Sequence, residues 1–409
     1  MAKLFLCGGG FGKQMEDTYP VFNAVIDHTK PLLYIPLAMP EETHTLDECY
    51  GWIQNELNEG GVKVPSVEMV RSYEEILTKE LSDYCALFIG GGNTFSLLKG
   101  LKDSGAFAKI KEYLQGDGVV FGSSAGEIIF GKDIMTAITE DPNDVGLQDT
   151  EGFDVLSGIS LDAHYTNAKT KEDHERVTAF LTNYSIEKGK VIALPEEDTL
   201  FIDGEEVQVI GSRPYYIFEN GVRLEKRAEL RNELTDNEWP LEYIDHDRWI
   251  ARGIVFDEEG NFYFIRAERD DMFGKATMIE TPGGGVEKGE NLNMAIRREL
   301  SEELGAEVDV ICKIGMVSDY YNIIHRHNLS NYFLCKVKSF GEKHLTEDEI
   351  NDFHLSTLKL TFDEAVAEYE KRRETPIGRL VANRELPVVQ RAKRIIDEMG
   401  LLAKAEKHR

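Results

Sequence analysis

The chain has 409 residues, of which 42% are hydrophobic and 29% are charged, and its formal net charge is −28. This length exceeds what one ordinary hydrophobic core supports, so it predicts at least two domains. The negative charge argues against unaided binding to a nucleic-acid polymer or an anionic membrane, because phosphate surfaces attract basic proteins. The same charge is compatible with binding divalent cations.

The cysteines and the N-terminal residues indicate in which cellular compartment the protein is expected. The five cysteines are scattered and form no C-x-x-C pair, which predicts small buried thiols in a reducing environment rather than disulfides or metal ligands. The opening "MAKLFLCGGG" holds too short an apolar run for a signal peptide, and no stretch approaches the length of a membrane span. We therefore expect a cytoplasmic protein.

The first half of the chain alternates short apolar runs with amphipathic stretches. Buried strands that end in glycine- or proline-bearing loops are expected at "KLFLCGGG", "PLLYIPLA", "YCALFIGGGN", "GVVFGSSAG" and "GKVIALPEE". This alternation predicts an α/β fold with a doubly wound, mostly parallel sheet and helices on both faces. Ligand sites in such sheets lie outside the carboxyl ends of the strands.

The pattern changes near Val207, where "VQVIGSRPYYIFENGVRL" reads as a hairpin-like pair that turns at Asn220-Gly221. A polar stretch and then two strands across an E-E-G-N turn follow. We expect a first domain over residues 1–220, a linker over 221–245, a second domain over 246–375 and a helical tail over 376–409. The apolar spacing of the tail suits packing on its own domain or on a second subunit, as in a homodimer.

The sharpest motif lies in the second domain. The stretch "GGGVEKGENLNMAIRRELSEELGAEV" fits G-x5-E-x7-R-E-U-x-E-E-x-G-U, where U is an apolar residue. A helix that begins near Asn291 places Glu299, Glu302 and Glu303 at i, i+3 and i+4, so three carboxylates share one face. A hard divalent cation, which prefers oxygen ligands, would relieve their repulsion. Glu290 and Arg298 are placed to pair and to hold the glycine-rich loop against the helix.

This stretch resembles the Nudix box, through Gly284, Glu290, Arg298, Glu299, Glu302, Glu303 and Gly305. Ala306 departs from the larger aliphatic residue that is usual at the last position. The resemblance implies an α/β/α domain with a mixed sheet that hydrolyses a nucleoside diphosphate linked to another group. It also implies Mg²⁺ or Mn²⁺ on Glu299, Glu302 and Glu303, which would neutralise the pyrophosphate and lower the pKa of the attacking water.

The general base in this family varies and often comes from a later loop. "HLTEDEIND" offers Glu347 and Glu349, of which we prefer Glu349, and a solvated acidic turn is the alternative. "ETPGGG", with Glu280 ahead of the proline, is similar to members that cleave ADP-ribose or nucleotide sugars. Tyr320 and Tyr321 could stack on a base, although core aromatics are the simpler reading.

A second motif, "GSSAG", lies between a predicted strand and a predicted helix start. It fits G-x-S-x-G with Ser124 at its centre, which is the strand-to-helix elbow that exposes a nucleophile. A serine nucleophile needs a base and an acid to orient that base. His164 in "LDAHYTN" follows a strand-like run, and "AITEDPND" supplies Glu140, Asp141 and Asp144.

With "IGGGNTFSLL", "GSSAG" and "HYTN" together, residues 1 to about 215 resemble the dipeptidase E and cyanophycinase family of serine peptidases. That family has a sheet like that of class I glutamine amidotransferases, and its order is serine, acid, histidine. The resemblance implies Ser124 as nucleophile and His164 as general base and then acid. It also implies that the Gly91-Gly92 loop and the Ala125 amide donate to the oxyanion.

The acid is less well determined, because the segment that carries it holds a small insertion. Asp141 is the first choice, Glu140 the second and Asp144 the third. Glu127 stands where the family has a small residue and could alter the pocket or repel an acidic substrate. Specificity for N-terminal aspartyl peptides is therefore not carried over.

The sequence thus predicts a fusion of two hydrolases. The expected partners are a nucleotide-linked small molecule and a small peptide, without a nucleic-acid polymer or a membrane. A reading of a different class stays open, in which one domain is a non-catalytic ligand-binding sensor that regulates the other.

Overall fold

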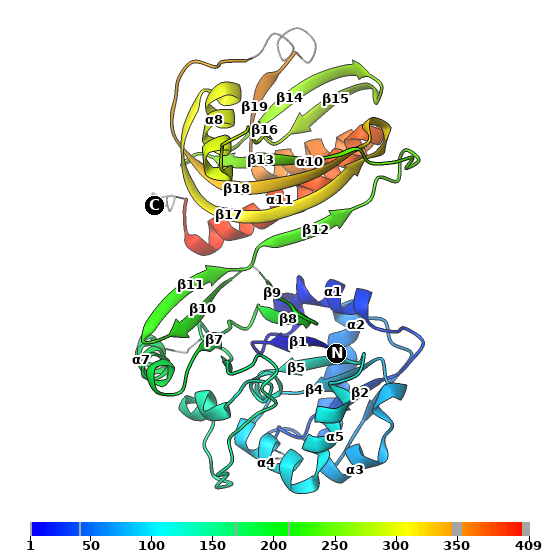
Figure 1. Cartoon of the computed structure of the whole chain (residues 1–409), viewed down its shortest axis with the longest axis vertical. Coiled ribbons are helices and arrows are strands. Elements are labelled where there is room, and N and C mark those ends of the chain that lie inside the picture. The colour runs from blue at the N-terminus through cyan, green and yellow to red at the C-terminus, as the bar shows by residue number, and fades with distance from the viewer. Residues whose placement is uncertain (1, 41, 168–169, 212, 346–353, 403–409) are drawn as a thin grey trace, which may run out of the picture. The chain divides into compact units, whose positions relative to one another are not determined.

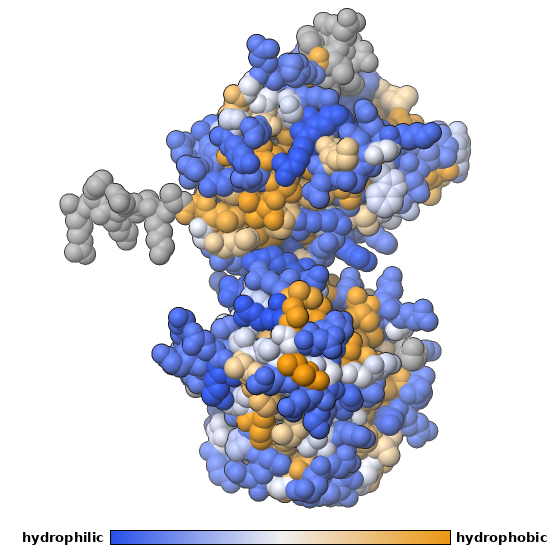
Figure 2. All heavy atoms as spheres, turned by 60° about the vertical axis from the view of Figure 1, so that its left-hand side comes forward, coloured by the Kyte–Doolittle hydropathy of each residue, from blue (hydrophilic) through white to orange (hydrophobic). Residues whose placement is uncertain are grey.

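The computed structural model describes residues 2–40, 42–167, 170–211, 213–345 and 354–402. The chain divides into two compact units, Met1–Ala228 and Glu229–Arg409, and Figure 1 shows the elements of each. Hydrophilic residues cover most of the visible face of each unit, with separate apolar patches between them (Figure 2). None of the helices in the described part is long and apolar enough to cross a membrane.

The first unit is built on a seven-stranded sheet with the order β3-β2-β4-β5-β1-β8-β9. The five strands from β3 to β1 are parallel, and β8 and β9 are antiparallel additions. The strands are β1 (Lys3–Cys7), β2 (Leu32–Ile35), β3 (Val67–Met69), β4 (Ala86–Ile89), β5 (Val119–Ser123), β8 (Thr199–Asp203) and β9 (Glu206–Ile210). The helices are α1 (Thr18–Val25), α2 (Leu46–Glu59), α3 (Tyr73–Thr78), α4 (Thr94–Ser104), α5 (Ala106–Tyr113), α6 (Ala125–Ile128) and α7 (Lys171–Glu187).

Alternation along the central strands gives this sheet two buried faces. In β1, Leu4 and Leu6 belong to the core that α4 and α5 cover, whereas Phe5 and Cys7 belong to the core that α1 and α2 cover. A strand buried on both faces must be apolar at every position. The continuous apolar runs of the sequence therefore become the central parallel strands, as predicted.

A four-stranded sheet, β11-β10-β7-β6, completes the first unit. Its strands are β6 (Ser160–Asp162), β7 (Val191–Ala193), β10 (Pro214–Glu219) and β11 (Val222–Arg227). Asn220 and Gly221 join β10 to β11 with φ values of 51° and 79°, which are the left-handed values that a tight hairpin turn requires. The predicted turn is therefore present, and β6 and β7 are parallel.

The second unit is an α/β/α sandwich around a mixed sheet with the order β12-β17-β18-β13-β14-β15. The strands are β12 (Leu230–Leu234), β13 (His246–Phe256), β14 (Phe262–Asp271), β15 (Gly274–Glu280), β16 (Gly283–Gly285), β17 (Ala306–Tyr321), β18 (Arg326–Phe340) and β19 (Ser356–Leu360). The helices are α8 (Leu292–Leu304), α10 (Phe362–Arg372) and α11 (Pro376–Met399). Ile296, Leu300 and Leu304 of α8 pack on one face of the sheet, and α10 and α11 cover the other.

Two expectations about the chain's organisation need correction or completion. The stretch 221–245 is not simply a linker, because β11 pairs with β10 in the first unit and β12 pairs with β17 in the second. Its polar composition reflects the exposed positions of β11. The helical tail contributes α11 to the core of its own unit, where Ile377, Val388 and Ile395 are buried.

Candidate functional sites

Ser124 lies at a sharp turn between β5 and α6. Its φ of 54° and ψ of −112° are sparsely populated values for a residue with a side chain. A Cβ at Gly122 would lie 2.2 Å from the carbonyl oxygen of Gly126, and one at Gly126 would lie 2.2 Å from that of Ile89. The two outer glycines of G-x-S-x-G are therefore required by close backbone contacts.

His164 lies in the loop after β6, opposite this turn. The Ser124 Oγ and His164 Nε2 atoms are 2.8 Å apart, which is a hydrogen-bond distance suited to proton transfer. The His164 amide donates to the carbonyl oxygen of Gly8. Gly9 leaves room for the ring, because a Cβ there would lie 2.1 Å from His164 Cε1. The glycine run after β1 therefore positions the histidine.

Glu196 provides the carboxylate that contacts the other ring nitrogen, with His164 Nδ1 and Glu196 Oε1 3.0 Å apart. The parallel pairing of β6 and β7 brings the loops that follow them together, because their carboxyl ends meet at one edge. Gln14 Nε2 donates to Glu196 Oε2, and the Glu196 amide donates to Asn167 Oδ1. The hydrogen bond from His164 outweighs burial and lowers the pKa of Glu196.

The acids expected from the sequence lie elsewhere, and this expectation is corrected. Asp141 Oδ2 accepts hydrogen bonds from the amide and hydroxyl of Thr94 at 2.8 and 2.6 Å, so it stabilises the start of α4. Burial raises the pKa of Glu140, which lies near enough to interact electrostatically with His164, and Asp144 is exposed. The three predicted acids lie between the serine and the histidine in the chain, whereas Glu196 follows the histidine, in "ALPEE".

The predicted oxyanion donors surround Ser124. A Cβ at Gly91 would lie 3.2 Å from Ser124 Cβ and 3.5 Å from Oγ, so the Gly91 backbone approaches the hydroxyl closely. Gly92 has a φ of 140°, and a Cβ there would overlap the carbonyl oxygen of Ala38. Ala125 begins α6 directly after Ser124.

Glu127 does not face the substrate side. Its side chain is 0% exposed, and neither carboxylate oxygen has a hydrogen-bond partner in the described part of the chain. Burial, reinforced by Asp162, raises its pKa well above the ordinary glutamic acid value. Burial therefore favours the neutral form of Glu127 and keeps its side chain away from solvent.

The second site is organised around α8, which begins and ends as the sequence predicts. The Asn291 side chain accepts from the Met294 amide, and Gly305 ends the helix in the left-handed conformation with a φ of 64°. A Cβ at Gly305 would lie 2.5 Å from the carbonyl oxygen of Gly341. Glycine is therefore required at position 305, both because the backbone is left-handed there and because a side chain would collide with the Gly341 carbonyl.

Arg298 is the centre of an ion-pair network on α8. Its Nε and Nη2 atoms donate to the two carboxylate oxygens of Glu290 at 2.8 and 2.9 Å, and Nη2 also donates to the Gly285 carbonyl. The Arg298 hydrogen bond is the main reason that the pKa of Glu290 is lowered to about 2. Arg298 Nη1 contacts Glu299 and Glu302 at 2.8 and 3.1 Å. The loop is thereby fixed to the helix.

The acidic residues of α8 face the Gly283–Gly285 strand. A Cβ at Gly284 would lie 2.7 Å from Glu299 Oε1, and the Gly283 amide donates to Glu303 Oε2 at 2.8 Å. Within the described residues no three acidic, histidine or cysteine side chains gather as a metal site, and Arg298 contacts both Glu299 and Glu302. The donors nevertheless fit a hard divalent cation, because they are carboxylates on one helix face beside side-chain-free glycines.

A cavity of about 330 Å³ opens beside Gly283, Gly284 and Glu303. Five arginines line it: Arg248, Arg252, Arg269, Arg326 and Arg384. Asn328, which is 0% exposed, also lines the cavity, and its side-chain oxygen accepts no hydrogen bond within the described structure. Such a cavity suits an anionic ligand.

Two of these arginines are balanced by buried acids. Arg384 Nη2 contacts Glu385 Oε1 at 2.7 Å, and Arg252 Nη1 lies 3.5 Å from the same oxygen. Arg252 and Arg384 each also contact Glu280 Oε2, at 3.4 and 3.5 Å. Arg384 Nη1 donates to the buried hydroxyl of Tyr321, which packs in the core of this unit and also lines the cavity. This pair is part of a structural network.

Arg248 and Arg326 are different, because neither has an ion-pair partner among the residues that the structure describes. Burial and then Arg252 lower the pKa of Arg248, and burial and then Arg248 lower the pKa of Arg326 to about 10. Neighbouring cations that destabilise one another in this way favour a bound anion.

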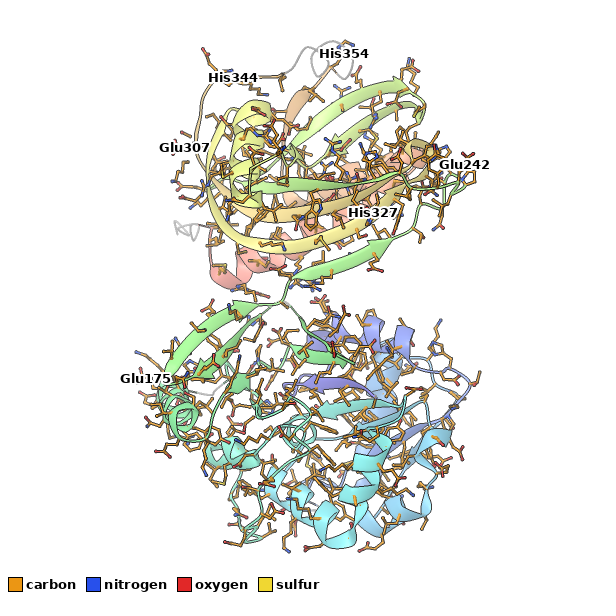
Figure 3. The ribbon with its side chains drawn as sticks, in the orientation of Figure 1. Glu175, Glu242, Glu307, His327, His344 and His354 are labelled. Carbon is orange, nitrogen blue, oxygen red and sulfur yellow. The ribbon has the colours of Figure 1, made fainter. Side chains whose placement is uncertain are left out.

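His327 lies outside the lining of the cavities at both sites. His327 on β18 (Figure 3) contacts Ser318 Oγ through Nε2 and Asp247 through Nδ1, at 2.7 and 2.8 Å, so both ring nitrogens are engaged. The expected base Glu349, with its alternative Glu347, lies outside the described residues.

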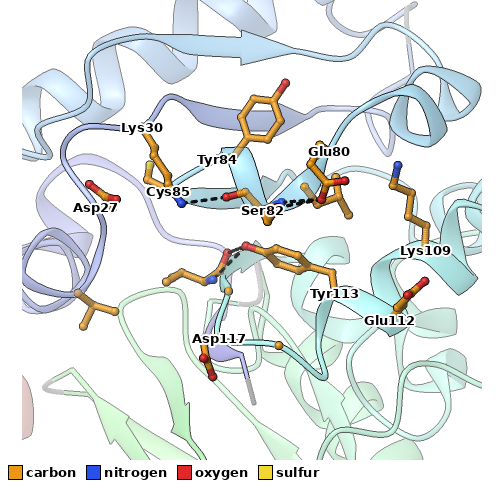
Figure 4. A pocket seen from close by; sticks show the side chains of 15 residues that line it. Asp27, Lys30, Glu80, Ser82, Tyr84, Cys85, Lys109, Glu112, Tyr113 and Asp117 are labelled. Carbon is orange, nitrogen blue, oxygen red and sulfur yellow. Dashed lines mark hydrogen bonds between the residues drawn. The ribbon is translucent and has the colours of Figure 1, made fainter.

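A cavity of about 540 Å³ in the first unit lies away from Ser124. Figure 4 shows its polar lining, in which Lys30 donates to the Ser82 carbonyl at 3.0 Å. Its residues precede β2, β4 and β5, so it lies at the amino ends of the parallel strands. Ligand sites in this fold lie at the carboxyl ends, where Ser124 lies.

Comparison with known proteins identifies both units. The profile of peptidase family S51 matches residues 4–210. The chain belongs to this family. The profile of the NUDIX domain matches residues 247–377, so the S51 domain is joined to a NUDIX domain.

Three individual proteins are similar to parts of this chain. The Peptidase E of Pasteurella multocida is 31% identical over 202 residues, which are 48% of this chain and 81% of that protein. A crystal structure of a putative Peptidase E from Listeria monocytogenes is 27% identical and covers 51% of this chain and 98% of its own, with a TM-score of 0.41. A NUDIX hydrolase structure from Nitrosomonas europaea is 16% identical and covers 40% of this chain and 99% of its own, with a TM-score of 0.28.

The chain is therefore a two-domain hydrolase that combines a peptidase domain of family S51 with a NUDIX pyrophosphohydrolase domain.

Proposed function

We propose that the NUDIX domain hydrolyses a nucleoside diphosphate linked to another group, in a reaction that depends on Mg²⁺ or Mn²⁺. The observation that supports it most is the arginine-lined cavity beside Gly283, Gly284 and Glu303. A pyrophosphate carries negative charge along its whole length, and arginines bind phosphate oxygens with a planar, multidentate fork. Arg248 and Arg326 supply this charge from neighbouring strands, since β13 and β18 are paired.

Glu299, Glu302 and Glu303 are the residues that we propose to hold the metal ion. A bound divalent ion would polarise the phosphoryl oxygens and lower the pKa of an attacking water. Arg298 already neutralises part of the charge of Glu299 and Glu302, which explains how these acids coexist on one helix. The neighbouring strand Gly283–Gly285 carries no side chains, so it leaves space for the phosphate groups of a substrate beside these acids. Within this class, ADP-ribose and nucleotide sugars are the substrates we favour.

The test is Glu303→Gln, measured as release of a nucleoside monophosphate in Mg²⁺. Its matched control is Glu307→Gln, because Glu307 is exposed on β17 (Figure 3), outside the cavity lining. We expect Glu303→Gln to reduce turnover to background and Glu307→Gln to leave it unchanged. Undiminished turnover in Glu303→Gln would exclude the assignment.

We further propose that the S51 domain hydrolyses a small peptide through Ser124, His164 and Glu196. His164 would accept the hydroxyl proton across the 2.8 Å contact and return it to the leaving amine. Glu196 would hold the imidazole in the tautomer that exposes Nε2 as an acceptor and would stabilise the imidazolium. The backbone amides at Gly91, Gly92 and Ala125 would stabilise the oxyanion.

An active-site serine reagent tests this proposal without knowledge of the substrate. A fluorophosphonate should label the parent at Ser124, and Ser124→Ala should abolish labelling. Ser123→Ala is the matched control, because this neighbouring side chain lies in β5, and it should still be labelled. Labelling that persists in Ser124→Ala would overturn the assignment.

In the alternative function, one domain binds its ligand without catalysis and regulates the other domain. We consider this alternative chiefly for the peptidase domain. The Ser124–His164–Glu196 contacts favour catalysis there too. A sensor would leave peptides uncleaved, and Ser124→Ala would change the rate of nucleotide hydrolysis. We expect peptide cleavage, and no change in nucleotide hydrolysis.

A further inference from the structure

A cavity of about 340 Å³ opens directly onto Ser124. It is bounded by the loop after β1, the end of β2, the helix α2 and the Gly91-Gly92 turn. Its large side chains are mostly apolar or aromatic: Phe11, Tyr34, Met39, Cys49 and Trp52. This volume lies within the range of pockets that enclose small ligands, so it has room for one bulky side chain.

Two aromatic residues of this cavity are unusually exposed. The side chain of Phe11 is 58% exposed and that of Trp52 is 40% exposed, although both are large and apolar. Trp52 contacts Phe88 edge-on, at 6.5 Å between ring centroids, which holds the indole at the cavity. Exposed apolar groups gathered beside a reactive centre indicate a surface that a ligand covers.

The charge of the cavity disfavours an acidic side chain. None of the described residues that line it is lysine or arginine. Its charged residue is Glu48, whose pKa is lowered by hydrogen bonds from the amide and hydroxyl of Thr45, so it is anionic at neutral pH. A carboxylate that enters would lose hydration without gaining a lysine or arginine partner among the described lining residues.

We propose that the serine site cleaves peptides in which a large aromatic or aliphatic residue flanks the scissile bond and places its side chain in this cavity. The proposal rests on the proposed peptidase function of Ser124. It identifies Trp52 and Phe11 as residues that determine specificity. A preference for aspartyl peptides is not expected, because no lysine or arginine is among the described residues that line the cavity.

The experiment compares kcat/KM for Phe-Ala, Ala-Phe, Ala-Ala, Asp-Ala and Ala-Asp. We expect Phe-Ala or Ala-Phe to exceed Ala-Ala by at least about tenfold, as burial of an aromatic side chain in an apolar pocket predicts. The isomer that is cleaved faster identifies which side of the scissile bond enters the cavity. Faster cleavage of an aspartyl dipeptide, or equal rates for all five, would overturn the proposal.

Substitutions of the cavity lining test whether the cavity causes the preference for a phenylalanyl dipeptide. Trp52→Ala should lower the ratio of the preferred phenylalanyl dipeptide to Ala-Ala by about tenfold, and Trp52→Phe should restore most of it. Phe11→Ala, at a more exposed position, should lower the same ratio if Trp52→Ala fails to fold. A ratio that is unchanged in folded Trp52→Ala or Phe11→Ala contradicts the proposal.

Failure of this inference is distinguishable from failure of the peptidase assignment. If Ser124 is labelled and dipeptides are cleaved with an aspartyl preference, the inference is wrong and the peptidase function stands. If Ser124 is not labelled and no dipeptide is cleaved, both are wrong.

Discussion

The pairing of Glu196 with His164 makes Glu196→Gln the most informative substitution in the peptidase half. The substitution preserves size and the contact with Gln14 but removes the negative charge 3.0 Å from His164 Nδ1. The amide can also turn its NH₂ group toward Nδ1, which would favour the tautomer that cannot accept the Ser124 proton.

The size of the effect follows from the geometry. Removing the charge of the orienting acid in serine triads lowers kcat by about 10⁴. The Glu196 side chain is 25% exposed, so solvent screens part of its interaction. We therefore expect a loss of about 10² to 10⁴, which corresponds to about 3 to 5 kcal/mol of transition-state stabilisation.

The assay is the second-order rate constant for labelling of Ser124 by a fluorophosphonate. Asp141→Asn is the matched control, because Asp141 contacts Thr94 rather than His164. We expect this control to unfold at a lower temperature but to react close to the parent rate. A full labelling rate in Glu196→Gln, or a large loss in Asp141→Asn, would refute the reasoning.

Three further predictions concern the buried acid and the NUDIX site. Folding raises the pKa of Glu127 above its unfolded value of about 4.5. The free energy of unfolding therefore falls as the pH rises above that unfolded pKa, because only the unfolded state loses the proton. The loss is about 1.4 kcal/mol per pH unit until the folded pKa is reached. Glu127→Gln should therefore gain stability relative to the parent between pH 5 and pH 8 in denaturant titrations, and a constant difference would contradict this. Gly284→Ala should displace the Glu299 carboxylate, which lies 2.7 to 2.8 Å from the added Cβ. The rate of nucleotide hydrolysis should then fall by about tenfold or more. An unchanged rate would show that hydrolysis does not require the Glu299 carboxylate in this position. EDTA should abolish nucleotide hydrolysis without affecting fluorophosphonate labelling, and equal sensitivity of both would argue against separate chemistries.

Much of the fold could be predicted because its strands are buried on both faces. Continuous apolar runs such as β1 and β5 have no other stable location than a covered sheet. The strand-like run before His164 is β6, whereas the short strand β8 is not predicted, since its five residues carry little periodicity. The stretch 221–245 reads as a linker because β11 is largely exposed and therefore polar.

The candidate sites were predictable where one local segment contains them. The Nudix motif and G-x-S-x-G both reflect local steric rules, as Gly305 and Gly122 show. Glu196 could not be assigned, because the pairing of β6 with β7 brings it to His164. The cationic cavity was equally hidden, since Arg248, Arg326 and Arg384 come from β13, β18 and α11 and meet only in the folded domain.

The central claim is that this chain carries two independent hydrolytic sites, and one crossed measurement tests it. Both activities, nucleoside monophosphate release in Mg²⁺ and dipeptide cleavage, are measured on the parent, Ser124→Ala and Glu303→Gln. We predict that Ser124→Ala loses only peptide cleavage and that Glu303→Gln loses only nucleotide hydrolysis. Loss of both activities in one variant, or of neither, would contradict the account.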